Sequence, residues 1–125
     1  MAPIIWYSKR QNTVETSSFG SEFIALRTGV EMIESLRYKL RMFGIPIDEP
    51  TYVFCDNQSV ITNSTTPGSK LSKKHVIIAY HRVRESIATG VIQIAYVPSK
   101  DNLADLLTKI LGGPQLKHLF QAILF

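Results

Sequence analysis

The sequence predicts an α/β domain with a parallel sheet, because short β-rich segments alternate with longer segments of helical periodicity. Three segments have the composition of strands, namely residues 4–9, 51–55 and 91–97. Long helices are expected between them, at about 18–43 and 73–89. Strands joined through helices in this way run parallel. Three strands are few for such a sheet, so we expect part of it to be missing.

The first long helix is predicted from apolar residues that recur at steps of three and four. They are Phe19, Phe23, Leu26, Val30, Ile33, Leu36, Leu40 and Phe43. Ser17 or Ser18 is expected to cap the helix, and Gly44 with Pro46 to end it.

Further helices are predicted in the second half of the chain. A short one is expected at about 57–63, followed by a turn or loop over 65–69. The long helix over 73–89 should end at Gly90, and its apolar face consists of Val76, Tyr80, Val83 and Ile87. Ser99 is expected to cap a helix that contains Leu103, Leu106, Leu107 and Ile110. A last helix covers about 114–124.

Length and composition narrow the class of protein. A chain of 125 residues with 45% hydrophobic residues suits one compact domain. No run of about 18 apolar residues occurs, so we expect no membrane span. Cys55 is the only cysteine, which favours a reducing, intracellular setting. A formal net charge of +4 and a pI near 9.3 are compatible with a polyanionic partner without demonstrating one.

Three acidic residues are candidates for a metal centre. Asp56 directly follows the strand 51–55, at the carboxyl edge where α/β sheets bind ligands. Glu22 lies one turn into the first helix at the border of its apolar face, and Asp105 lies in the helix after the last strand. Oxygen ligands of this kind suit Mg²⁺ or Mn²⁺. Two such ions about 4 Å apart are able to clamp the attacking and leaving oxygens of a phosphodiester.

Each of these acids also has an ordinary explanation. A glutamate at the border of a helix face is usually a solvated charge. An aspartate after a strand is often a helix cap, and an aspartate in a first turn favours the helix dipole. Spacing alone therefore leaves both interpretations open.

Four blocks of sequence, in order along the chain, help to choose between these two interpretations of the acidic residues. The first combines WYSKRQNTV (6–14) with SSFGSEF (17–23), and the second is CDNQS (55–59). The third is KHV…YHRVRE (74–85), and the fourth is YVPSKDNLADLLTK (96–109). Together they resemble the ribonuclease H domain of copia-type LTR retrotransposon Pol polyproteins.

The resemblance implies a fold, an activity and a set of metal ligands. The fold would be a mixed sheet flanked by helices, here lacking the first two strands, with an incomplete domain over 1–112 and a C-terminal helix over 113–125. The activity would be metal-dependent hydrolysis of the RNA strand of RNA–DNA hybrids during reverse transcription. Glu22, Asp56 and Asp105 match family carboxylates that hold two Mg²⁺ or Mn²⁺ ions, and the Asp105 ligand is expected to be the more labile.

One departure from the family pattern bears directly on activity. The family's first aspartate lies on a strand that should precede Trp6, and nothing in this sequence replaces it. We therefore expect the isolated chain to be weak or inactive. It remains open whether the chain is a non-catalytic remnant, a nucleic-acid-binding fragment, or a module that another segment completes.

The expected partners are an RNA–DNA hybrid and the reverse transcriptase portion of the same polyprotein, in a cytoplasmic virus-like particle or the nucleus. The candidate nucleic-acid contacts are a basic cluster, with Lys70 at its edge, and polar residues near the acids: Ser17, Asn57, Gln58, Lys73, Lys74 and His75. His81 is expected to be a packing or surface residue, and Cys55 and Trp6 are expected in the core.

Overall fold

The computed structural model describes residues 3–11, 18–66 and 76–124, which fall into two compact units. The larger unit is Glu15–Tyr96, and the smaller combines Met1–Val14 with Val97–Phe125. The expected boundary at residue 112 stays a prediction. None of the helices among the described residues has the length and apolar character needed to cross a membrane.

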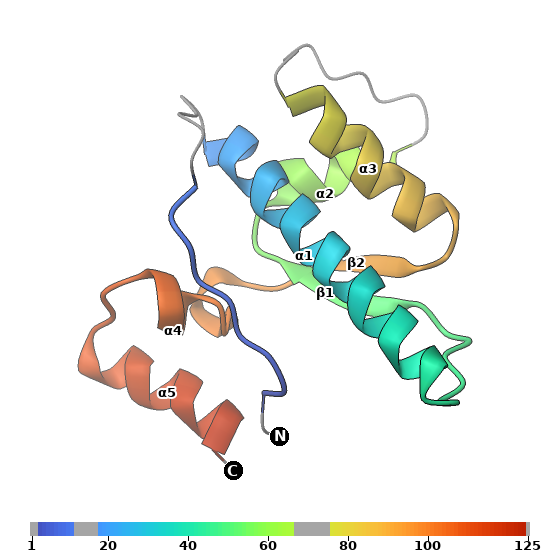
Figure 1. The fold of residues 1–125 in the computed structure, drawn as a ribbon. Helices are drawn as coiled ribbons and strands as arrows, with labels where there is room; N and C mark the ends of the chain where they lie inside the picture. The colour runs from blue at the N-terminus through green and yellow to red at the C-terminus, as the bar shows by residue number, and fades with distance from the viewer. Residues whose placement is uncertain (1–2, 12–17, 67–75, 125) are drawn as a thin grey trace. The chain divides into compact units, whose positions relative to one another are not determined.

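The described residues of the larger unit form three helices and two strands (Figure 1). In chain order they are α1 (Ser18–Met42), β1 (Thr51–Cys55), α2 (Gln58–Thr65), α3 (Ile77–Ala88) and β2 (Ile92–Tyr96). β1 and β2 are parallel, with Thr51 opposite Ile92 and Cys55 opposite Tyr96. The α/β class and the parallel direction are thus confirmed, in a unit that is mostly helical. A ribonuclease H fold stays a prediction.

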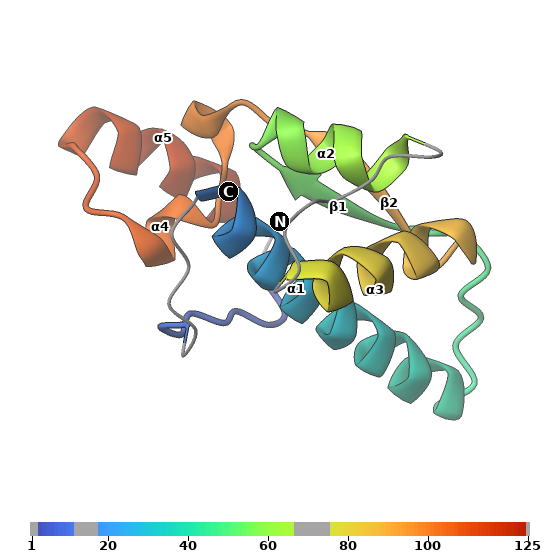
Figure 2. The same ribbon diagram turned by 90° about the horizontal axis from the view of Figure 1, so that it is seen from above.

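The core of this unit lies between the three helices and one face of the strand pair. Its buried residues come from every element and include Phe23, Val30, Val60, Tyr80, Val83 and Ile92. α1 and α3 lie side by side in both views of the ribbon (Figures 1 and 2). The apolar faces predicted for these two helices are therefore the faces that they bury, although Phe43, past the end of α1, is 83% exposed and was assigned wrongly.

The opposite face of the strand pair is exposed to solvent. Side chains alternate along a strand, so Tyr52 and Phe54 point away from the helices and are 59% and 64% exposed. Among the described residues, β1 and β2 pair only with each other. Parallel sheets normally have both faces covered. The larger unit thus presents one covered face and one uncovered face of a sheet.

The predicted strand over residues 4–9 is wrong. These residues belong to the described part of the chain but join no ladder. Ile4, Ile5, Trp6 and Tyr7 are all more than half exposed, so the expectation that Trp6 is a core residue is wrong as well. A strand forms only where a neighbour accepts its backbone hydrogen bonds. The described residues supply no such neighbour for this segment.

Glycine ends both long helices, as the sequence predicts. Gly44 and Gly90 have positive φ angles of 77° and 72°, which favour glycine. The amides that follow turn back onto the helices, with Ile45 N donating to Leu40 O at 3.0 Å and Val91 N to Ser86 O at 3.0 Å. These turns send the chain from α1 towards β1 and from α3 into β2.

A buried arginine fixes the connection between α1 and β1. The Arg37 Nη1 donates to Glu49 O at 2.8 Å and to Thr51 Oγ1 at 2.9 Å. Arg37 is only 7% exposed, and a buried guanidinium requires such hydrogen-bond partners. The start of β1 is therefore tied to α1.

In the smaller unit, the expected helix from Ser99 is interrupted. A 3-10 turn, η2 (Ser99–Asp101), is followed by the short α4 (Asp105–Thr108), and α5 (Gly113–Leu124) confirms the last predicted helix. The side chain of Asn102 accepts from Ala104 N at 3.1 Å, a local bond that competes with helix continuation. Ser8 Oγ donates to Leu107 O at 3.1 Å and joins the two segments of this unit.

We expect Val83→Ala to lower the free energy of unfolding by about 2 kcal/mol, because it leaves a cavity at a fully buried site between α3 and α1. Chemical denaturation of both proteins measures the difference. Ile78→Ala on the same helix is the matched control, since Ile78 is 70% exposed. Equal losses in the two variants would contradict the packing described here.

Candidate metal centre

Asp56 lies at the carboxyl end of β1, where the chain leaves the sheet and enters α2. The cap of α2 is the next residue, Asn57, whose Oδ1 accepts from Ser59 N at 3.1 Å and Val60 N at 3.2 Å. The ordinary explanation of Asp56 as a helix cap therefore does not hold. Its half-buried carboxylate remains at the edge of the sheet.

Glu22 reaches the same edge from α1. The next residue, Phe23, is fully buried, with its ring centre 5.1 Å from that of Phe19 and 5.9 Å from that of Tyr80. This packing fixes the first turns of α1 against α3. Glu22, beside Phe23 on the helix, is held half-buried at the border of the core, as predicted.

The carboxylates of Glu22 and Asp56 lie close together, and the thiol of Cys55 lies beside them. One ligand atom each from Glu22, Cys55 and Asp56 lies within 4.8 Å of the other two. The structure thus places together two of the three acids that were expected to converge, Glu22 and Asp56.

The two carboxylates of this cluster suit a hard divalent cation. Mg²⁺ binds oxygen at about 2.0–2.1 Å, so two oxygens on one ion are at most about 4.2 Å apart. The carboxylate oxygens of Glu22 and Asp56 are within 4.8 Å of each other, which is close to that separation. The residues fit one shared ion, and a second ion would need further ligands.

Cys55 was expected to be a core residue, and its burial confirms this. Its proximity to the two carboxylates was missed, although its position directly before Asp56 was a usable signal. Burial raises the pKa of the Cys55 thiol, a backbone hydrogen bond at Asn57 opposes the rise, and the charges of Glu22 and Asp56 add to it. The folded protein therefore favours the neutral thiol, which leaves the two oxygen donors as the anionic ligands.

Asp105 belongs to the smaller unit and opens α4. Its side chain is only 7% exposed, and it pairs with Lys109, whose Nζ is 2.9 Å from one carboxylate oxygen and 3.0 Å from the other. The pairing of an aspartate with a lysine four residues later also fits the ordinary interpretation, a stabilised short helix. The expected convergence of Asp105 with Glu22 and Asp56 stays a prediction.

The predicted nucleic-acid contacts fall partly outside the described residues, where Ser17, Lys70, Lys73, Lys74 and His75 lie. Asn57 caps α2, and Gln58 is exposed at the first turn of the same helix. His81 lies on the surface with its ring edge-on to Tyr80, at 5.1 Å between ring centres, which agrees with the expected packing or surface role.

The chain is similar to retrotransposon polyproteins. It is 30% identical over 121 residues, 97% of its length, to the retrovirus-related Pol polyprotein from transposon RE2 of Arabidopsis thaliana. The corresponding protein from transposon RE1 of the same plant is 31% identical over 121 residues. The one from transposon TNT 1-94 of Nicotiana tabacum is 35% identical over 108 residues, 86% of the chain.

The chain spans about 8% of the length of each of these relatives. No family model matches it, and no solved structure matches it significantly. The chain is therefore homologous to a short segment of copia-type retrotransposon Pol polyproteins.

We expect the Cys55 thiolate to appear at higher pH in the folded protein than in the urea-unfolded chain. The pKa is raised in the folded state, so between the ordinary and the raised value only the unfolded chain carries the thiolate. The ultraviolet absorbance of the thiolate, followed against pH, measures both transitions. Asp56→Asn should bring the folded transition closer to the unfolded one. Coincident transitions in the unaltered chain would contradict the described environment of Cys55.

Proposed function

We propose that the chain is an incomplete ribonuclease H module of a copia-type Pol polyprotein, with Glu22 and Asp56 as ligands of a divalent cation. The observation that carries the proposal is the meeting of these two carboxylates at the carboxyl end of β1. Homology to a segment of Pol polyproteins supports it. So does the match of Glu22, Asp56 and Asp105 to the acidic positions of the blocks that resemble this module.

The proposed substrate is the RNA strand of an RNA–DNA hybrid, and the proposed cofactor is Mg²⁺ or Mn²⁺, with two ions in the complete site. A bound cation would polarise the scissile phosphate and favour ionisation of a water molecule. Glu22 and Asp56 would bind and orient it at the edge of the sheet. The proposed protein partner is the reverse transcriptase portion of the same polyprotein.

Two observations support weak or absent activity in the isolated chain. The described residues bring two carboxylates together, and Asp105 is neutralised by Lys109. The outer face of β1 and β2 is also uncovered, with Tyr52 and Phe54 exposed. A module of this kind would need further strands before it holds two ions. These observations also favour the second candidate, a non-catalytic remnant or nucleic-acid-binding fragment.

We expect little or no cleavage of a labelled RNA strand in an RNA–DNA hybrid by the isolated chain, with either Mg²⁺ or Mn²⁺. The physical reason is an incomplete set of metal ligands. Chelator and Asp56→Asn serve as controls. Strong metal-dependent cleavage that Glu22→Gln abolishes would overturn the expected inactivity.

A completed module should separate the two candidate functions. The segment that precedes the matched region in the transposon RE1 polyprotein is joined to the N-terminus of this chain. We expect this fusion to cleave the RNA strand in the presence of Mg²⁺. Asp56→Asn should reduce the cleavage rate more than ~100-fold, because loss of a residue that only supports a metal ligand already lowers activity by up to ~100-fold. A folded fusion that binds the hybrid without cutting it would contradict the ribonuclease proposal and leave the binding fragment.

A further inference from the structure

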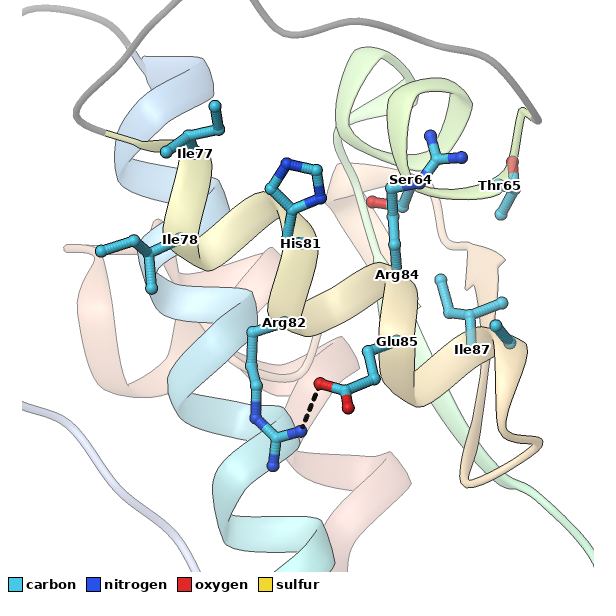
Figure 3. A pocket seen from close by; sticks show the side chains of 10 residues that line it. Ser64, Thr65, Ile77, Ile78, His81, Arg82, Arg84, Glu85 and Ile87 are labelled. Atoms are coloured by element: carbon cyan, nitrogen blue, oxygen red, sulfur yellow. Dashed lines mark hydrogen bonds and ion pairs between the residues drawn. The ribbon is translucent and has the colours of Figure 1, made fainter.

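A wide, open hollow of about 870 Å³ lies on the larger unit, between the end of α2 and the outward face of α3 (Figure 3). Isoleucine side chains line one end of it, including Ile78, which is 70% exposed. His81 and Arg84 line it farther along α3. We call this surface the α3 hollow. It is distinct from the candidate metal centre and shares no residue with it.

Arg84 supplies a fixed positive charge to the α3 hollow. Its Nη1 donates to three neutral oxygens, Asn63 O at 3.2 Å, Thr66 O at 3.0 Å and Tyr80 Oη at 2.7 Å. Its guanidinium also lies 5.2 Å from the centre of the Tyr80 ring. Among the described residues no carboxylate pairs with it. These contacts hold the guanidinium in place without cancelling its charge.

Arg82 differs from Arg84 in this respect. It forms ion pairs with Glu34 and, at 3.1 Å, with Glu85, the second of which Figure 3 marks. Its charge is therefore largely compensated, and its role is to join α3 to α1. Glu85 also lines the hollow and is paired with Arg82, so the cationic character of the hollow rests on Arg84, with His81 exposed beside it.

The stretch of sequence that leads into α3 is also positively charged. Between Asp56 and Glu85 the chain contains no acidic residue, yet it contains Lys70, Lys73, Lys74, Arg82 and Arg84, five of the 14 lysines and arginines. The stretch ends within α3 at Glu85, which lines the hollow and pairs with Arg82. The one acidic side chain of α3 is thus compensated by a neighbouring arginine, and Arg84 keeps its charge.

We propose that the α3 hollow binds the backbone of a nucleic acid strand. Phosphates are the anions that an arginine held by its own hydrogen bonds binds well. Sugars and base faces suit the apolar sides that the isoleucines provide, as in binding grooves that track a strand. The open form of the hollow suits a polymer that continues beyond it. This inference extends the proposed function by adding a contact to its substrate class, and it does not depend on a metal.

The test introduces one negative charge inside the hollow and the same charge outside it. Ile78→Glu changes an exposed lining residue, whereas Met42→Glu changes a residue of nearly equal exposure, 71%, at the end of α1. The full chain is titrated with a fluorescent RNA–DNA hybrid in the presence of chelator. Circular dichroism and melting temperature verify that both variants fold as the unaltered chain does.

We expect Ile78→Glu to weaken hybrid binding about tenfold and to make it less dependent on salt, while Met42→Glu changes it no more than about twofold. Ile78→Lys should tighten binding, and Met42→Lys should not. Equal effects at the two positions would overturn the proposal, because net charge alone would then explain them. Absence of binding by the unaltered chain would also overturn it. Chelator keeps the result independent of cleavage, so failure of the metal centre and failure of the hollow are distinguishable.

Discussion

The burial of Phe23 is the interaction on which the candidate centre depends. It fixes the first turns of α1 against Tyr80 of α3 and leaves the adjacent Glu22 at the carboxyl end of β1. Two unit charges at about 4.8 Å repel by roughly 1 to 3.5 kcal/mol, for effective dielectric constants of about 80 and 20. Burying a phenylalanine contributes about 1.5–3 kcal/mol, a comparable amount. Core packing thus holds the two carboxylates close together against their mutual repulsion.

The uncovered sheet face connects the fold to the proposed function. β1 and β2 have a core on one side only, and the outward side chains Tyr52 and Phe54 are apolar or aromatic rather than charged. Exposed aromatic residues on an open strand pair are typical of a surface that another element covers. Under the proposed function, the strands that would cover this face are the ones that the resemblance expects before Trp6.

The sequence predicted the elements whose signals are local. The helical periodicity of α1, the stops at Gly44 and Gly90, and the bounds of β1 all follow from neighbouring residues, and the structure has them. The meeting of Glu22 with Asp56 was also predictable, because both lie at the end of elements that a parallel sheet brings together. That residues 4–9 form no strand was not predictable from these residues, because strand formation depends on a partner elsewhere in the chain. The break at Asn102 depends on one side-chain hydrogen bond that periodicity does not reveal.

The most direct measurement is the broadening by Mn²⁺ of backbone amide signals in the nuclear magnetic resonance spectrum of this chain. If Glu22 and Asp56 share one ion, amides near both residues broaden together at substoichiometric Mn²⁺, and Asp56→Asn removes both effects. Broadening that remains unchanged in Asp56→Asn, or that centres on Asp105, would contradict the account.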